Sequence, residues 1–128
     1  MTPHRARELS QDETRLLGEG LAEFDGGRFW HAHESWEDLW NSLKRRMAAP
    51  EEILLVQGMI QTAALLLHYG NQNSRGVTSQ WEKLLPKLQH WNTAWGLDIA
   101  THLSVIETFA EDVGLWSKEP TTHLFPKA

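Results

Sequence analysis

The chain has 128 residues, of which 41% are hydrophobic and 23% charged, so it has the composition of one globular domain with its own core rather than of a disordered chain. Its 12 Lys and Arg residues against 17 Asp and Glu residues give a formal net charge of −5, which excludes the basic footprint that nucleic acid or an anionic membrane requires. It contains no Cys, which excludes a disulfide scaffold, a thiolate nucleophile and any Cys-ligated zinc or iron–sulfur site.

Two further features of the composition bear on location and function. The polar start of the chain predicts no secretory segment, and no uninterrupted apolar run reaches the roughly 18 residues of a membrane span. Together with the absence of Cys, these features lead us to expect a cytoplasmic protein. Seven Trp and seven His residues stand out, and the Trp residues are expected to form core and pocket walls.

The first two predicted helices are marked by terminal signals and by one apolar face each. Ser10 and Glu13 have the spacing of a capping box, and the helix that they begin ends at the Asp25-Gly26-Gly27 turn. A second helix is predicted over about residues 28–47, with positive charge in its last turn, where the helix dipole favours cations. Its apolar stripe consists of Phe29, Ala32, Trp36, Leu39, Trp40, Leu43 and Met47.

The third predicted helix is the most hydrophobic segment of the chain. It covers about residues 51–69, with Pro50 suited to its first position and Gly70-Asn71 to its end. Apolar side chains point nearly all round it. A helix of that kind is buried, so this segment is predicted to be the central helix of a bundle.

The C-terminal half predicts two more helices and no sheet. One covers about residues 77–90 and is expected to kink at Pro86; the other runs from a cap at Asp98 to Gly114. Residues 1–9 and 117–128 are expected to be extended tails. Strand-like alternation and the usual hairpin signals are missing. The predicted fold class is therefore all-α, a single domain over residues 1–128 built as an antiparallel bundle of about five helices.

Three polar residues interrupt the apolar surface of the third helix. At about 100° per residue, Gln57, Gln61 and His68 fall within roughly 40° of one another on the helical wheel. The seam is too narrow for a solvent-facing surface and contains no acidic or Lys/Arg side chain. Because a buried polar group without a partner costs roughly 1–3 kcal/mol, a neighbouring element is expected to offer polar groups to this seam.

The second helix is the expected source of those groups. His33 lies at the edge of its apolar stripe and Glu37 lies one turn further on, so both side chains can address one point in space. Trp30, Trp36 and Trp40 are expected to wall this site. His33 and Glu37, together with His68, make a set suited to one divalent ion, zinc, manganese or iron. The same set also suits a metal-free base with its orienting partners.

The residues themselves support three hypotheses. The first is a metal-dependent hydrolase, in which His33, Glu37 and His68 hold the ion and Glu34 or Glu37 acts as base. The second is a non-enzymatic module that binds a small molecule or peptide in a pocket lined also by Gln57 and Gln61. The third is a structural network of buried polar side chains that sets helix register.

The segment after the first helix carries a distinctive arrangement. In residues 24–40 (FDGGRFWHAHESWEDLW), a Phe, a Gly turn and an aromatic residue lead into Ala-His-Glu, with Glu and Trp one and two turns later. This segment resembles the signature of the domain of unknown function 309 family. Residues 57–64 with His68 resemble its second block. The third block of the family signature has a counterpart in Gly70-Asn71 with Arg75-Gly76. Its C-terminal helix has a counterpart in residues 96–99 with Leu103.

The resemblance spans about residues 21–113, and the sequence departs from the family pattern around Pro86. It implies a small all-helical fold and carries the family's loose description as a predicted metal-dependent hydrolase. By position, the family's polar residues correspond to His33, Glu34, Glu37, Gln61 and His68. Neither the resemblance nor the composition indicates a substrate or an oligomeric state.

Overall fold

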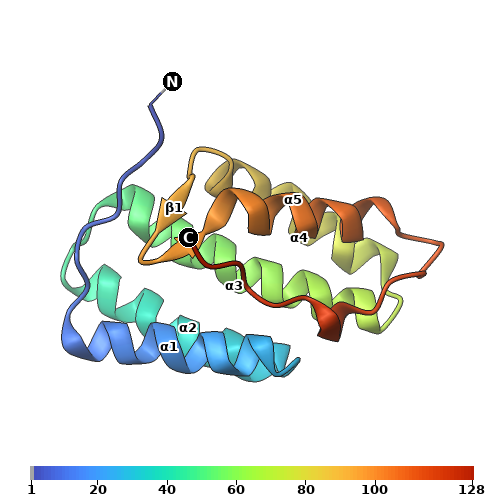
Figure 1. Ribbon diagram of the computed structural model, residues 1–128, viewed down its shortest axis with the longest axis horizontal. Helices are drawn as coiled ribbons and strands as arrows, with labels where there is room; N and C mark the ends of the chain where they lie inside the picture. The colour runs from blue at the N-terminus through green and yellow to red at the C-terminus, as the bar shows by residue number, and fades with distance from the viewer. Residues whose placement is uncertain (1) are drawn as a thin grey trace.

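The computed structural model describes residues 2–128 and shows an all-α protein with one small hairpin (Figure 1). The elements in chain order are α1 (Gln11–Asp25), α2 (Phe29–Arg45), α3 (Pro50–Gly70), α4 (Ser74–Leu88), β1 (Thr93–Ala94), β2 (Leu97–Asp98), α5 (Ile99–Glu111) and the short 3₁₀ helix η1 (Pro120–Thr122). The predicted all-α helical bundle is confirmed.

The predicted helix starts agree with the structure where a local cap sets them. Ser10 accepts from the backbone of Glu13 while the Glu13 carboxylate accepts from the backbone of Ser10, which completes the capping box of α1. Pro50 occupies the first turn of α3, and Asp98 caps α5 by accepting from the Thr101 amide.

Two helix boundaries differ from those predicted. α2 ends at Arg45, and Met47 lies beyond it with a φ of 54° and 88% of its surface exposed, so Met47 does not extend the apolar stripe. α4 begins at Ser74 because the Asn73 side chain accepts from the Gly76 amide and supplies an earlier cap. It continues through Pro86 to Leu88.

The hairpin β1–β2 corrects the expectation that the chain contains no strands. Its two-residue turn is Trp95-Gly96, with φ values of 51° and 78°. A two-residue turn with positive φ at both positions is the type that sequence reasoning associates with Asn-Gly or Asp-Gly. Trp95 is held there by its indole Nε1, which donates to the Arg7 carbonyl at 2.8 Å.

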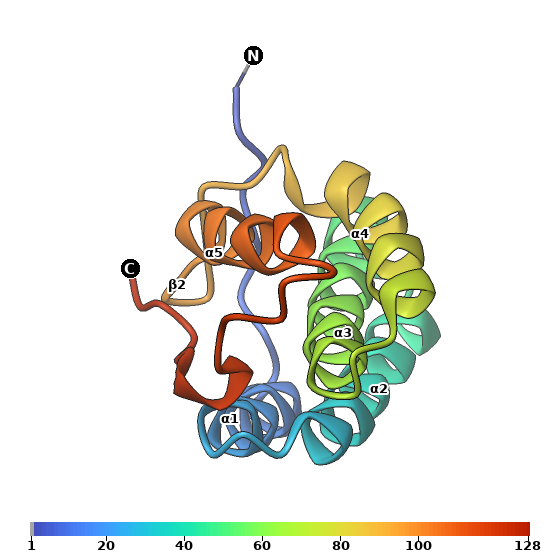
Figure 2. The same cartoon turned by 90° about the vertical axis from the view of Figure 1, so that its right-hand side faces the viewer.

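α3 is the central helix, as predicted. Seen end-on, it lies between α2, α4 and α5 (Figure 2), and it packs against all three. By length and a mean hydropathy of 1.4 it is the one helix among residues 2–128 that could cross a membrane, yet 56% of that apolar window is buried inside the bundle. Its hydropathy is thus consistent with the core helix of a soluble protein. Leu66 is fully buried, whereas Leu54 is 44% exposed.

The C-terminal segment lies between α1 and α5 and takes part in the core (Figure 2). Phe125 is buried, and its backbone amide donates to Asp25 at the end of α1. The backbone of Lys127 pairs with that of Leu97 in an isolated antiparallel β-bridge beside the hairpin. At the other end of the chain, the amide of Arg7 donates to Glu52 of α3 at 2.6 Å.

A polar cleft between three helices

The side chains of α2 and the seam of α3 meet in one cleft of about 260 Å³, which is completed by α4. We call it the polar cleft. The helices α2 and α4 both pack on α3 and lie on the same side of it (Figure 2). The cleft is lined by His33, Glu37 and Trp40 from α2, by Gln57, Ile60, Gln61 and Ala64 from α3, and by Gln80 from α4.

His33 is the most constrained polar group of the polar cleft. The Trp30 ring stacks on it, with ring centroids 5.2 Å apart and planes at 11°. Its Nδ1 atom is buried and has no hydrogen-bond partner among residues 2–128. The nearest carboxylate oxygen, Glu37 Oε2, lies 3.9 Å away, which is beyond hydrogen-bond distance. His33 therefore keeps an unused donor or acceptor beside the cleft.

Trp40 presents a second unused group. Its indole Nε1 is buried without a hydrogen-bond acceptor within the described part of the chain. The Lys44 ammonium lies 3.4 Å from the centroid of the ring and holds the indole by a cation–π contact. Since a buried indole N–H normally finds an acceptor, Trp40 Nε1 is a second unsatisfied donor in a residue that lines the polar cleft.

The amide of Gln61 is oriented by a lysine from α4. Lys87 Nζ donates to Gln61 Oε1 at 3.1 Å and to the Lys83 carbonyl at 2.9 Å. Because an ammonium group only donates, the contact identifies the oxygen of the Gln61 amide and leaves its NH₂ group as a donor. Burial lowers the pKa of Lys87, and the neighbouring Lys83 lowers it further.

Three residues expected at this site lie elsewhere. Trp36 is fully buried on the core side of α2, where its Nε1 donates to the Leu17 carbonyl at 3.3 Å. Glu34 projects to another side of α2 and lies 3.3 Å from His31 Nδ1. His68 lies two turns beyond Gln61 along α3, where its Nδ1 is 3.2 Å from the side-chain nitrogen Nδ2 of Asn73. The exposed Trp30 contributes only through its stacking on His33.

The donor set for the expected metal ion does not come together. Within residues 2–128, no three His, Asp or Glu side chains are placed to hold one ion. His33 and Glu37 are neighbours, but His68 is engaged with Asn73. The residues present therefore do not fit the proposed three-ligand site.

Sequence reasoning missed the contribution of α4. Gln80 lines the polar cleft, and Lys87 orients Gln61. Both lie on the helix face that packs against α3, but both are long polar side chains that a helical wheel assigns as readily to solvent. No local motif marks either one.

A family model described as a domain of unknown function (DUF309) matches residues 17–80. The chain belongs to the DUF309 family. The matched part of this DUF309 protein contains every residue that lines the polar cleft, from His33 to Gln80. No curated protein and no solved structure matches the chain.

Proposed function

We propose that this DUF309 protein binds a small polar molecule in the polar cleft. The observation that carries the proposal is the pair of buried, unpartnered atoms His33 Nδ1 and Trp40 Nε1 in residues that line one cavity. Leaving such atoms unpaired costs about 1–3 kcal/mol each. Because both atoms are buried, a ligand recovers that free energy when the His33 and Trp40 side chains rotate to turn these atoms toward it.

The size and lining of the polar cleft define the chemistry of the ligand. Its volume of about 260 Å³ lies just below the range of roughly 300–1,000 Å³ that suits drug-sized molecules, so the ligand is compact. Three Gln amides offer both donors and acceptors, while Ile60 and Ala64 supply a small apolar surface. A molecule with amide or ureide groups matches this lining better than a hydrocarbon or a polyanion.

Binding without catalysis is favoured over metal-dependent hydrolysis for a structural reason. A catalytic zinc site normally uses three protein ligands and keeps one position for water, and only His33 and Glu37 meet in the polar cleft. Cytoplasmic location remains our expectation from the absence of Cys.

The test is a titration of isotopically labelled protein with acetamide and hydantoin, followed by the side-chain amide resonances of Gln57 and Gln80, which line the polar cleft and are present in every variant. We expect a saturable shift of those resonances, and a loss of binding in Trp40→Phe, which lacks the indole N–H. A second variant, Gln61→Ala, should weaken binding, while Gln89→Ala, at an exposed position after α4, should not.

Two results would overturn the proposal. One is a linear, non-saturating shift with both probes that is the same in wild type and Trp40→Phe. The other is stoichiometric binding of zinc or manganese that disappears in His33→Ala, since that outcome would restore a metal site to the same residues.

A further inference from the structure

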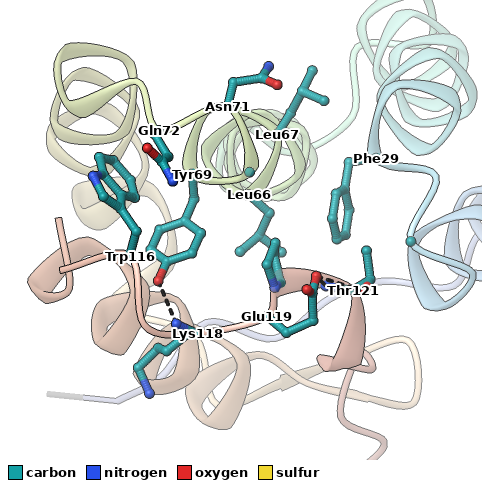
Figure 3. A pocket seen from close by; sticks show the side chains of 13 residues that line it. Phe29, Leu66, Leu67, Tyr69, Asn71, Gln72, Trp116, Lys118, Glu119 and Thr121 are labelled. Carbon is teal, nitrogen blue, oxygen red and sulfur yellow. Dashed lines mark hydrogen bonds between the residues drawn. The ribbon is translucent and has the colours of Figure 1, made fainter. Parts of the chain in front are cut away.

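A second cavity lies on another part of the molecule, where α3 ends (Figure 3). We call it the tail pocket because the segment after α5 forms one of its walls. Its volume is about 330 Å³. The walls come from the start of α2, from the last turns of α3 and from residues 116–121, so it shares no lining residue with the polar cleft.

Aromatic rings supply much of the wall of the tail pocket. Phe29 and Tyr69 stand on opposite sides of it with Leu66 between them (Figure 3). Trp116 packs edge-on against the Tyr69 ring, with centroids 5.1 Å apart. A planar ring can therefore pack against the aromatic side of the cavity, as in pockets for small organic molecules.

The tail pocket is preformed because Tyr69 is fixed at its hydroxyl. That hydroxyl donates to Asp112 Oδ2 at 2.5 Å and accepts from the Lys118 amide at 2.9 Å. Asp112 in turn accepts from the backbone amide and the side chain of Ser117. These bonds tie the end of α5 and the following segment to α3, so the wall does not depend on a ligand for its position.

The charge inside the tail pocket is negative. The Glu119 carboxylate accepts from the amide and hydroxyl of Thr121, at 3.4 and 3.0 Å, and makes no ion pair within the described residues. The Lys118 ammonium points away from the cavity (Figure 3) and lies 5.9 Å from the centroid of the Phe109 ring. The tail pocket thus presents a carboxylate without a matching cation.

We propose that the tail pocket binds a small aromatic amine, with the ring against the aromatic side of the pocket at Tyr69 and Trp116 and the ammonium group at Glu119. The ring gains apolar and edge contacts from the wall, and the ammonium group pairs with the carboxylate and lies near aromatic faces that attract cations. This site is independent of the polar cleft, since the two cavities differ in position, charge and aromatic content.

The experiment compares 2-phenylethylamine with 2-phenylethanol, which has the same ring and chain length but no charge. Binding is followed by the backbone amide resonances of Gln72 and Thr121. We expect saturable binding of the amine, with an affinity about fivefold higher than that of the alcohol, as for an ion pair at a partly exposed site. Glu119→Gln should remove that fivefold preference and leave the affinity for the alcohol unchanged.

The matched control is Glu107→Gln, the same change of charge at an exposed position on α5, which should leave both affinities unaltered. Glu119→Lys should reverse the preference. Glu119 is exposed, and Glu119→Gln keeps an oxygen that can accept from Thr121, so this variant retains the cap of η1. Equal affinity for amine and alcohol in the wild type would overturn the proposal, as would a preference that survives in Glu119→Gln or the absence of saturation with either probe. The Trp40 indole resonance reports on the polar cleft and should not move with these probes.

Discussion

His123 Nε2 lies 2.9 Å from His102 Nδ1, and this contact joins the C-terminal segment to the interior of the bundle. His102 Nε2 lies 3.0 Å from the Thr62 hydroxyl, which itself donates to the Met59 carbonyl at 2.7 Å. Thr62 must therefore accept from His102 Nε2–H, which leaves Nδ1 to accept from His123 Nε2–H. His102 is neutral in this arrangement because its Nδ1 accepts a hydrogen bond, and its ring stacks on Phe125 with centroids 3.9 Å apart.

We predict that stability falls as the pH drops below about 6.5. Burial lowers the pKa of His102 well below its usual 6.5, with the neighbouring His123 adding to the effect. Burial also lowers the pKa of His123, although Asp25 opposes that shift. The unfolded chain therefore binds protons near pH 6.5 that the folded protein does not. Unfolding is favoured as the pH falls, by up to about 1.4 kcal/mol per pH unit for each His.

Chemical denaturation between pH 8 and pH 5 measures this effect. His123→Gln should reduce the slope of stability against pH, because one of the two groups no longer titrates. His31→Gln, at a side chain that is 62% exposed, should preserve it. A stability that is constant from pH 8 to pH 5 would contradict a neutral, buried His102 ring and a lowered pKa of His123.

A second prediction concerns acid stability and Glu13. The carboxylate is buried and accepts from Arg46 Nε at 2.8 Å and from Ser42 at 2.9 Å. Its hydrogen bond with Arg46 is the main cause that lowers its pKa from 4.5 to about 2, with Ser10 and Ser42 contributing and desolvation opposing. The stabilisation is present above pH 4.5 and is lost as the pH falls towards 2, and it amounts to about 3 kcal/mol.

Glu13→Gln should therefore lower the free energy of unfolding by about 2–3 kcal/mol at pH 7 and flatten its pH dependence below 4.5. The control is Glu19→Gln, which removes the exposed pair with Arg15 and should cost less than about 0.5 kcal/mol. If the two variants lose the same stability at pH 7, the contact between Glu13 and Arg46 does not stabilise the packing of α1 on α2.

Local signals in the sequence predict the helix starts because a cap depends on residues within four positions of one another. Ser10 with Glu13, Pro50 and Asp98 are examples. Contacts between distant segments have no such signal. The bond from the Phe125 amide to Asp25 joins residues 100 positions apart, and nothing in the tail sequence predicts that it enters the core.

At the candidate site, a helical wheel predicts which side chains face one another but not how far apart they lie along the helix. The wheel gives the angle of a side chain about the helix axis, and on that basis it places His33 opposite the Gln57–Gln61 seam, as observed in the polar cleft. It gives no height along the axis. His68 has nearly the same angle as Gln61 but lies seven residues away, which is about 10 Å along the helix, too far to share a ligand with His33.

A third prediction uses two glycines of α1. A Cβ added at Gly20 would overlap the indole of Trp36, which is fully buried and cannot move aside. Gly20→Ala should therefore destabilise the protein by about 1–3 kcal/mol or more through overpacking. Gly18 lies in the same helix with nothing within 4 Å of such a Cβ. Gly18→Ala should stabilise by about 0.5–1 kcal/mol, since Ala favours the helix.

Thermal melts of the two variants provide the comparison. The melting temperature should fall in Gly20→Ala and rise in Gly18→Ala, although both variants add the same methyl group. A shift of the Trp36 indole N–H resonance in Gly20→Ala, and none in Gly18→Ala, would tie the loss to that indole. Equal and small effects at both positions would show that α1 moves away from α2 without cost.

The last prediction separates a ligand site from a structural network at Glu37. The Glu37 side chain is 48% exposed, and its Oε2 lies 3.9 Å from His33 Nδ1. We predict that Glu37→Gln lowers the free energy of unfolding by less than about 1 kcal/mol, as for other exposed pairs. A closed network with a buried imidazolium would instead lose about 3–5 kcal/mol, because the cation would keep no counter-ion.

Denaturation of wild type and Glu37→Gln at pH 6 and pH 8, with and without a chelator, measures the difference. A small loss at both pH values, together with altered binding of the amide probes, places the role of Glu37 in ligand recognition. A loss above about 2 kcal/mol would mean that the fold depends on the contact between Glu37 and His33. In that case the unpartnered Nδ1 of His33 would be a structural donor, and the proposal of a ligand in the polar cleft would rest on Trp40 alone.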